Sequence, residues 1–225
     1  MFWRLLFAHF LADYPLQPSW MAANKVRLPV LLLHAGVHFV TMLLVTAPAW
    51  RELWPYLLIL AMVHFGIDFG KLALNKYQPR WVALPYLIDQ ILHYLSLAAL
   101  AWWIGRQTGD LGLLLNPHLA VMMTAYLLVT YVWAISEKVL TVSDPEYRRE
   151  LASGFWPRMA VRALLLTGLL GLSLPGLPDR GQIGLGITLP YFSGQFARRA
   201  LLTDGLVVAG AWLFILAAYG QLAGG

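Results

Sequence analysis

Five of the six histidines in this chain lie four residues from another histidine or from an aspartate. The couplets are His9–Asp13, His34–His38, His64–Asp68 and Asp89–His93. Because residues four apart lie on one face of an α-helix, each couplet would present its two side chains together. Such groups can bind metal ions, relay protons or hydrogen-bond to one another. The sixth histidine, His118, follows a proline and is interpreted as interfacial.

The elements that carry these couplets are expected to be membrane helices. The chain of 225 residues is 60% hydrophobic and only 12% charged, whereas about a quarter of the residues in an ordinary soluble domain are charged. Its mean hydropathy is +0.65. The absence of cysteine excludes disulfides and thiolate metal ligands. The sequence therefore predicts an all-α fold, a polytopic transmembrane helix bundle in contact with the lipid bilayer.

Six to eight membrane segments are expected. They cover about residues 2–14, 28–47, 53–74, 82–104, 117–140 and 159–174, followed by a final apolar region that reaches residue 223. The first is short for a span, which needs about 20 residues. Pro190, Gly194 and the pair Arg198–Arg199 interrupt the last region, so residues 184–223 could cross once or twice. We expect one integral membrane domain over 1–225, with a four-segment core in 1–105 and additional helices in 106–225.

The basic residues predict the orientation. Lys and Arg are concentrated in alternate loops: Lys25 and Arg27 in the first, Lys71, Lys76 and Arg80 in the third, and Lys138, Arg148, Arg149 and Arg158 in the fifth. Because cytoplasmic loops carry the excess of Lys and Arg, these loops are expected in the cytoplasm and the N-terminus outside. This orientation also explains the net charge of +5 without nucleic-acid binding, which is not expected.

The same topology places all four couplets at one depth. With about 1.5 Å of rise per helical residue, every couplet falls roughly 5–20 Å from the cytoplasmic boundary. The four couplets are therefore expected to share one pocket.

Three explanations of this pocket compete. The side chains could brace the helices through hydrogen bonds, form a proton or ion pathway, or bind metal. Each intramembrane aspartate costs about 2.5–3.5 kcal/mol, which disfavours bracing alone for four couplets. Clustering at one depth disfavours a relay across the bilayer. We therefore favour metal, with eight candidate ligands: His9, Asp13, His34, His38, His64, Asp68, Asp89 and His93.

The ligand types also limit the metal. Imidazole and carboxylate suit zinc, with manganese or iron as alternatives. Three aspartates and a bridging hydroxide would balance two divalent cations, so the expectation is a dinuclear site or one ion with charged groups around it. Asp68 or Asp89 could serve as general base. Lys71 could pair with Asp68 or contact an anionic substrate, and Gln17, Gln90 and Asn75 could orient the ligands.

Four motifs carry a resemblance to a known family. HFLADYPLQPSWMAANK, LLHAGVH, HFGIDFGK and IDQILH resemble, over about residues 4–100, an uncharacterised family of bacterial inner-membrane proteins that is a domain of unknown function. They resemble more distantly the membrane-bound metal-dependent hydrolases. The later passage YFSGQFARRALL is similar to a Gly-x-x-Glu-Arg passage of the family, matching at Gly194 and Arg198 but with Ala197 at the acidic position.

The sequence thus favours a metal-dependent membrane hydrolase with its site near the cytoplasmic face. A lipid-borne phosphoester is the expected substrate class, because the site would open at headgroup depth. The resemblance implies the bacterial inner membrane as its location. The alternatives are a proton or divalent-metal-ion transporter or channel that uses the same residues, and a structural membrane subunit. The oligomeric state is left open.

Overall fold

The computed structural model describes residues 1–78, 80–108, 111–173 and 198–223, and this part of the chain contains helices and no strand. Six of the helices described are long and apolar enough to cross a membrane: Leu28–Val45, Trp50–Tyr77, Ala83–Gln107, Pro117–Leu140, Phe155–Ser173 and Arg199–Leu222. This confirms the predicted all-α fold with six to eight segments and is compatible with a multi-pass membrane protein. The chain divides into two compact units, Met1–Thr124 and Ala125–Gly225. The expectation of a single membrane domain stays a prediction.

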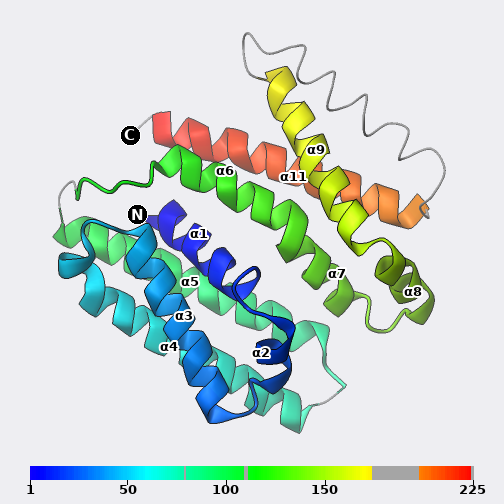
Figure 1. Cartoon of the computed structure of the whole chain (residues 1–225), viewed down its shortest axis with the longest axis horizontal. Helices are drawn as coiled ribbons and strands as arrows, with labels where there is room; N and C mark the ends of the chain where they lie inside the picture. Colours follow the sequence, from blue (N-terminus) through cyan, green and yellow to red (C-terminus); the bar gives the residue numbers. More distant parts are fainter. Residues whose placement is uncertain (79, 109–110, 174–197, 224–225) are drawn as a thin grey trace. The chain divides into compact units, whose positions relative to one another are not determined.

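Unit 1 is built around four helices that close on one another (Figure 1). They are α1 (Phe2–Asp13), α3 (Leu28–Val45), α4 (Trp50–Tyr77) and α5 (Ala83–Gln107), with the short α2 (Ser19–Asn24) between the first two. Helix α3 packs against α1 and α4, and α5 packs against α4 and α1. Each helix therefore has two neighbours in the group, and the inward faces of all four can contribute to one common interior.

That interior is apolar at one end and polar at the other. Helix α4 buries leucines in its first half and a histidine and an aspartate in its second half, at helical spacing: Leu53, Leu57, Leu60, His64 and Asp68. Helix α5 has the opposite order, with polar residues first: Asp89, Gln90, His93, Leu97, Ala101 and Ile104. Since short turns connect consecutive helices, neighbours run in opposite directions, and their polar halves lie at the same end of unit 1.

The outward faces of these helices are apolar as well. Leu44, Met62 and Leu95 are 73%, 66% and 61% exposed. A helix that is apolar on its outer face as well as its inner face suits a lipid environment, in which the polar residues must turn inward. The couplets satisfy that condition because all of them lie on the buried faces.

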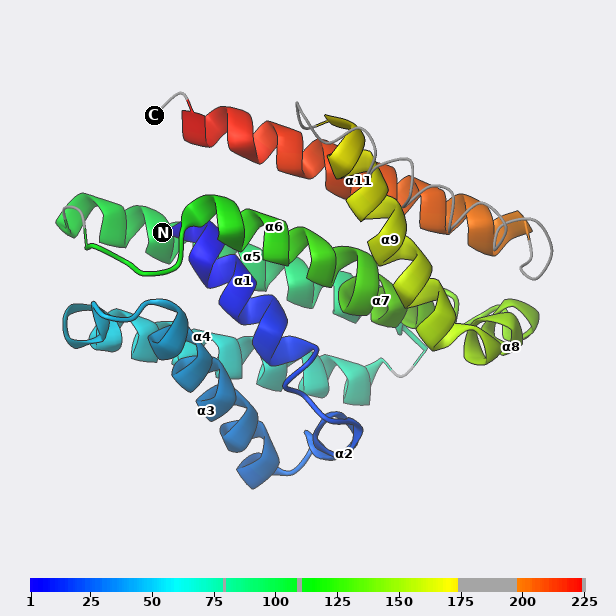
Figure 2. The same ribbon diagram turned by 45° about the horizontal axis from the view of Figure 1, so that its top comes forward.

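Unit 2 contains the remaining helices. Helix α6 (Pro117–Leu127) starts in unit 1 and continues through the π-helical turn η1 (Leu128–Val132) into α7 (Trp133–Leu140). Then come α8 (Pro145–Ser153), α9 (Phe155–Ser173) and α11 (Arg198–Ala223). Helices α9 and α11 pack against each other and against η1, and Figure 2 shows the crossing of α9 over α11.

The structure adds local detail to the predicted segments. The sequence indicated a polar connection after residue 140, and part of this connection forms helix α8. The helix starts there because the Asp144 carboxylate accepts a hydrogen bond from the Tyr147 N–H at 3.0 Å and Pro145 occupies the first turn. Within residues 184–223, the described part forms one helix of spanning length, Arg198–Ala223. Pro190, Gly194 and Ala197 lie outside the described residues.

Candidate metal centre

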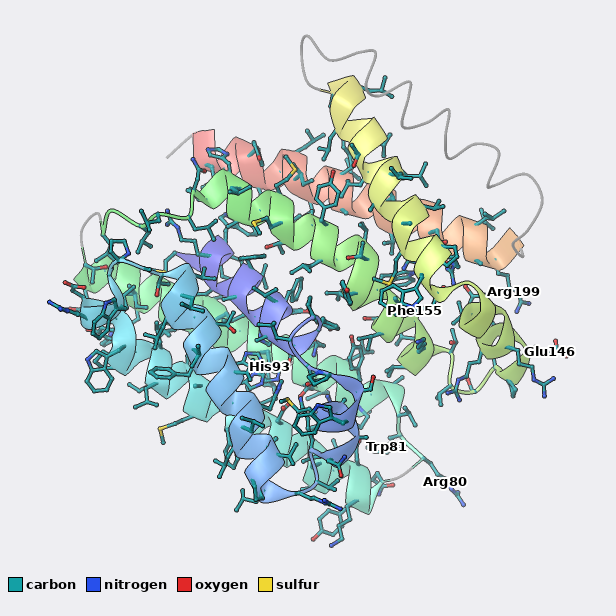
Figure 3. The ribbon with its side chains drawn as sticks, in the orientation of Figure 1. Arg80, Trp81, His93, Glu146, Phe155 and Arg199 are labelled. Atoms are coloured by element: carbon teal, nitrogen blue, oxygen red, sulfur yellow. The ribbon has the colours of Figure 1, made fainter. Side chains whose placement is uncertain are left out.

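The four couplets come together inside unit 1. All eight residues are at most 9% exposed, and they arise from α1, α3, α4 and α5: His9, Asp13, His34, His38, His64, Asp68, Asp89 and His93. Figure 3 shows His93 among the side chains that fill unit 1. The four-residue spacing aligns the members of each couplet on one helix, and the closed packing of the helices brings the couplets into contact.

Asp13 is the first point of convergence. Its Oδ1 atom lies 3.1 Å from Nε2 of His34, 3.1 Å from Nε2 of His38 and 4.0 Å from Nε2 of His64. Its Oδ2 atom lies 3.3 Å from Nε2 of His9. One carboxylate at the end of the short helix α1 thus contacts histidines from α1, α3 and α4. The prediction that the first segment contributes to the shared pocket therefore has a geometric basis.

Asp68 is the second point of convergence. Its Oδ2 atom lies 3.4 Å from Nε2 of His34 and 3.7 Å from Nε2 of His64, and its Oδ1 atom lies 3.6 Å from Nε2 of His93. His93 also approaches Asp89, with 3.4 Å between its Nε2 and Oδ1. The rings of His64 and His93 stack at a centroid distance of 4.2 Å. His64 therefore links the groups around the two aspartates.

The neighbours of His34 Nε2 show why this cluster suits a cation. This one nitrogen lies 3.0 Å from Nε2 of His64, and Oδ atoms of Asp13 and Asp68 are at 3.1 and 3.4 Å. A ring nitrogen carries at most one proton and cannot donate to three acceptors. A cation bound beside His34 would remove this competition for one proton. Burial makes the alternative of unsatisfied polar atoms costly.

The spacing of the ligand atoms fits a metal ion. In a tetrahedral site with metal–ligand distances of about 2.0–2.1 Å, the ligand atoms lie about 3.4 Å apart. One atom each from Asp13, His34, His38 and His64 lies within 4.8 Å of all the others, and the same holds for His64, Asp68 and His93. The Nε2 atoms of His9 and His93 are buried and make no hydrogen bond among the described residues, although carboxylate oxygens lie 3.3–3.6 Å from them, a separation that a cation between the two atoms would fit. These residues could hold a metal.

Two lysines change the charge of the site. Lys25 Nζ lies 2.9 Å from Oδ2 of Asp68, and Lys71 Nζ lies 2.8 Å from Oδ2 of Asp89. Lys71 thus pairs with Asp89 and not with Asp68, the partner considered from the sequence. With two of three carboxylates neutralised, a single divalent cation with one anionic ligand would balance the charge. The geometry therefore favours one ion over the two that three unpaired aspartates would call for.

The three amides proposed to orient ligands separate in the structure. Gln90 donates from Nε2 to Oδ2 of Asp89 at 3.1 Å, and its Oε1 accepts from the Tyr94 hydroxyl at 3.0 Å. The Oε1 of Gln17 is buried without a hydrogen-bond partner in the described part of the chain. Asn75 is exposed and lines a separate groove between α3 and α4. Within the described part of the chain, Gln90 is the one amide of these three that forms a hydrogen bond with a residue of the His/Asp cluster.

Lys25 is a contributor to this site that the sequence did not indicate. It was counted only as a cytoplasmic loop charge, since it belongs to no couplet. Its position beside α3, at the cytoplasmic end predicted for the couplets, was the available signal.

Unit 2 contains a second buried charge network, which the sequence also did not reveal. Asp204 Oδ1 lies 2.6 Å from Nη2 of Arg158 and 2.7 Å from Nη1 of Arg162, and the same Nη2 of Arg158 lies 2.9 Å from Oε1 of Glu137. Arg162 also donates to the Val129 carbonyl in η1. The network is formally neutral, with two guanidinium and two carboxylate groups. The available indication of this network in the sequence was the presence of charged residues inside apolar segments.

Tyr147 extends this network at its edge. Its hydroxyl donates to Oε1 of Glu137 at 2.6 Å. Burial and this hydrogen bond raise the pKa of Tyr147 above its ordinary value, so it stays a neutral donor. Arg199, by contrast, is 78% exposed at its side chain and contacts Asp144 at 3.4 Å (Figure 3).

A known protein family matches the part of the chain that contains the His/Asp cluster. The model of a family described as protein of unknown function (DUF3307) matches residues 1–122, more than half of the chain, so the chain belongs to this family. The match includes all eight residues of the cluster. No curated protein and no solved structure matches the chain. The resemblance to membrane-bound metal-dependent hydrolases therefore stays an expectation.

Proposed function

We propose that this member of the DUF3307 family is a metal-dependent integral membrane hydrolase that acts on a lipid-borne phosphoester. The observation that carries the proposal is the position of His34 Nε2, which has one imidazole nitrogen and two carboxylate oxygens within 3.4 Å. Such crowding of acceptors is typical of a site that holds a cation.

Asp13, His34, His38 and His64 are the residues we assign to hold the ion. Zinc suits this set of three imidazoles and one carboxylate, and manganese or iron are the alternatives. A bound divalent ion would polarise a phosphoryl oxygen and lower the pKa of a water molecule towards neutrality.

The carboxylates beyond this set are the candidates for proton transfer. Asp68 and Asp89 both approach Nε2 of His93, at 3.6 and 3.4 Å. The ammonium group of a lysine lies 2.9 Å from Asp68 and 2.8 Å from Asp89, and each contact fixes the position of the carboxylate. We assign one of them the role of general base, with His93 between them to carry the proton away. Lys71 would also attract the negative charge of a phosphoester.

The polar end of unit 1 suits a substrate at the membrane surface. Asp89 lies six residues from the start of α5 and Asp68 nine residues from the end of α4, which places them about 9–14 Å from those helix ends. The distribution of basic residues assigns this end to the cytoplasmic face. We therefore place the site near the cytoplasmic headgroups of the bacterial inner membrane, with the N-terminus outside.

A transporter of protons or divalent ions is the second candidate, because the same contacts join the eight residues into one continuous polar cluster. The other end of the unit 1 interior argues against it. Leu53, Leu57 and Ile104 are fully buried there, and Leu97 is 2% exposed. Because apolar side chains fill this end of the interior, the polar cluster does not extend into a polar path across the bilayer.

Metal analysis of the purified protein tests the proposal. Wild type should retain about one divalent ion per chain, and His34→Ala and His64→Ala should lose it. His118→Ala, which changes the one histidine outside the cluster, is the matched control and should keep it. At least one of Asp68→Asn and Asp89→Asn should retain the ion but lose hydrolysis of a lipid phosphomonoester in mixed micelles.

Three results would point elsewhere. Absence of stoichiometric metal after gentle purification and re-addition would overturn the hydrolase proposal. Metal-dependent ion flux into liposomes without cleavage of lipid phosphoesters would favour the transporter. Variants that lose only thermal stability would indicate that the cluster braces the helices.

A further inference from the structure

A groove on the outer surface of unit 1 leads to the His/Asp cluster. It lies between α4 and α5 and has a volume of about 360 Å³. Its walls are mainly apolar side chains, and Lys71 and Asp89 are its polar members; the apolar side chains are Val63, Ile67, Leu74, Ile88 and Leu92. Because the exposed side chains on α4 and α5 are largely apolar, this surface suits contact with lipid.

Two glycines keep the groove open. Gly66 and Gly70 both line it and lie one helical turn apart on α4. A Cβ atom built on either glycine meets no other atom within 4 Å. The helices therefore do not use these glycines for close packing in unit 1, and the space beside them is free for another molecule.

The polar members connect the groove to the cluster. The Lys71 ammonium donates to Oδ2 of Asp89 at 2.8 Å, while Oδ1 of the same aspartate lies 3.4 Å from Nε2 of His93. The Lys71 side chain is 28% exposed, whereas that of Asp89 is 2% exposed. Lysine thus presents a positive charge to the groove, and the aspartate behind it belongs to the buried site.

We infer that this groove binds the substrate lipid, with its acyl chain along Gly66 and Gly70 and its phosphate against Lys71. The inference rests on the hydrolase proposal and names the binding site that the proposal lacks. The apolar walls match a hydrocarbon chain, and the partly exposed ammonium group of Lys71 matches an anionic headgroup. A soluble phosphoester has no hydrocarbon chain for the apolar walls, and a neutral lipid has no negative charge for Lys71.

The depth of Lys71 agrees with this assignment. Helix α4 has 28 residues and is therefore about 42 Å long, which exceeds the hydrocarbon core of about 30 Å. Lys71 lies six residues, or about 9 Å, from the end of the helix at Tyr77. It therefore lies near the edge of the hydrocarbon core, from which its long side chain can extend towards the lipid phosphates, with the glycines on its hydrocarbon side.

Photo-crosslinking tests the groove directly. The full-length protein in lipid nanodiscs is labelled with a phosphatidic acid that carries a diazirine in its acyl chain. Labelled peptides should come from residues 63–92. Gly66→Leu and Gly70→Leu should each lose most of this labelling, because both positions line the groove and the new side chain would occupy it. Gly36→Leu is the matched control, since Gly36 is also exposed and unobstructed but lies on α3 outside the groove.

Lys71→Met tests the headgroup contact. This variant should lose the preference for the phosphatidic acid probe over a diacylglycerol probe with the same diazirine chain. Labelling that is spread evenly over all the spanning helices, or labelling unchanged in both groove variants, would overturn the inference.

The metal content separates this inference from the proposed function. Gly66→Leu and Gly70→Leu should keep the wild-type metal content, because neither residue touches the cluster. If metal and hydrolysis of a short soluble phosphoester persist while groove labelling is absent, the groove inference fails alone. If groove labelling occurs in a protein that binds no metal, the hydrolase proposal fails and the lipid site stands.

Discussion

The ammonium group of Lys25 lies 2.9 Å from Oδ2 of Asp68, so the chain just before α3 supplies a positive charge to the inner face of α4. The same carboxylate lies within 3.7 Å of His34 and His64. A lysine ammonium has no lone pair to offer a metal and repels any cation beside it. Lys25 therefore sets how much positive charge the site accepts.

Lys25→Met should raise the affinity of the site for divalent metal. Removal of the ammonium frees Asp68 and removes the repulsion between two positive charges, so we expect affinity to rise by about tenfold, which corresponds to about 1.4 kcal/mol. Competition with a chelator of known affinity measures it. Lys76→Met, an exposed change on the same unit, should leave the affinity unaltered. A weaker affinity in Lys25→Met would show that Lys25 positions Asp68 more than it opposes the metal.

Metal binding should stabilise unit 1. At a free metal concentration 100 times the dissociation constant, binding to the folded state alone contributes about 2.7 kcal/mol. Chelation should therefore lower the unfolding temperature in detergent, and zinc should restore it. Asp13→Asn should abolish the response, because Asp13 contacts four histidines. A response that persists in Asp13→Asn would place the ion elsewhere.

Gln90→Leu should slow hydrolysis by about tenfold with little change in metal content, because it removes the amide that holds Asp89. Asn75→Leu is the control among the amides that the sequence proposed, since Asn75 is exposed and lies in another groove. The rates of both variants are measured with a lipid phosphomonoester in mixed micelles. Equal rates for the two variants would remove Gln90 from the site.

Asp204→Ala should destabilise unit 2 by about 3–5 kcal/mol, because it leaves the buried guanidinium groups of Arg158 and Arg162 without their shared carboxylate. Arg199→Ala breaks an ion pair whose arginine is largely exposed and should cost less than about 1 kcal/mol. Denaturant unfolding in detergent compares the two. Similar costs would show that the buried network contributes no more than a surface pair.

Some elements of the structure could be predicted from the sequence more fully than others, for physical reasons. The span at residues 117–140 was predicted to the residue, since apolar length and a proline at its start are local properties. Helix α8 is short and polar, so apolar length does not reveal it, although Asp144 and Pro145 are standard signals for a helix start. The hydroxyl of Tyr94 joins the site through a hydrogen bond to Gln90. These two residues are four apart on one helix, and many other pairs in the sequence have the same spacing, so spacing alone does not single out this contact.

The sequence by itself determined the helical membrane fold and the face on which each couplet lies, because apolar length and the 3.6-residue repeat depend on local backbone geometry. Only the tertiary structure decided which groups meet between helices. His34 contacts Asp13 and Asp68, Lys25 contacts Asp68, and Lys71 contacts Asp89. These pairings depend on the rotation and shift of one helix against another, which no spacing along a single helix fixes.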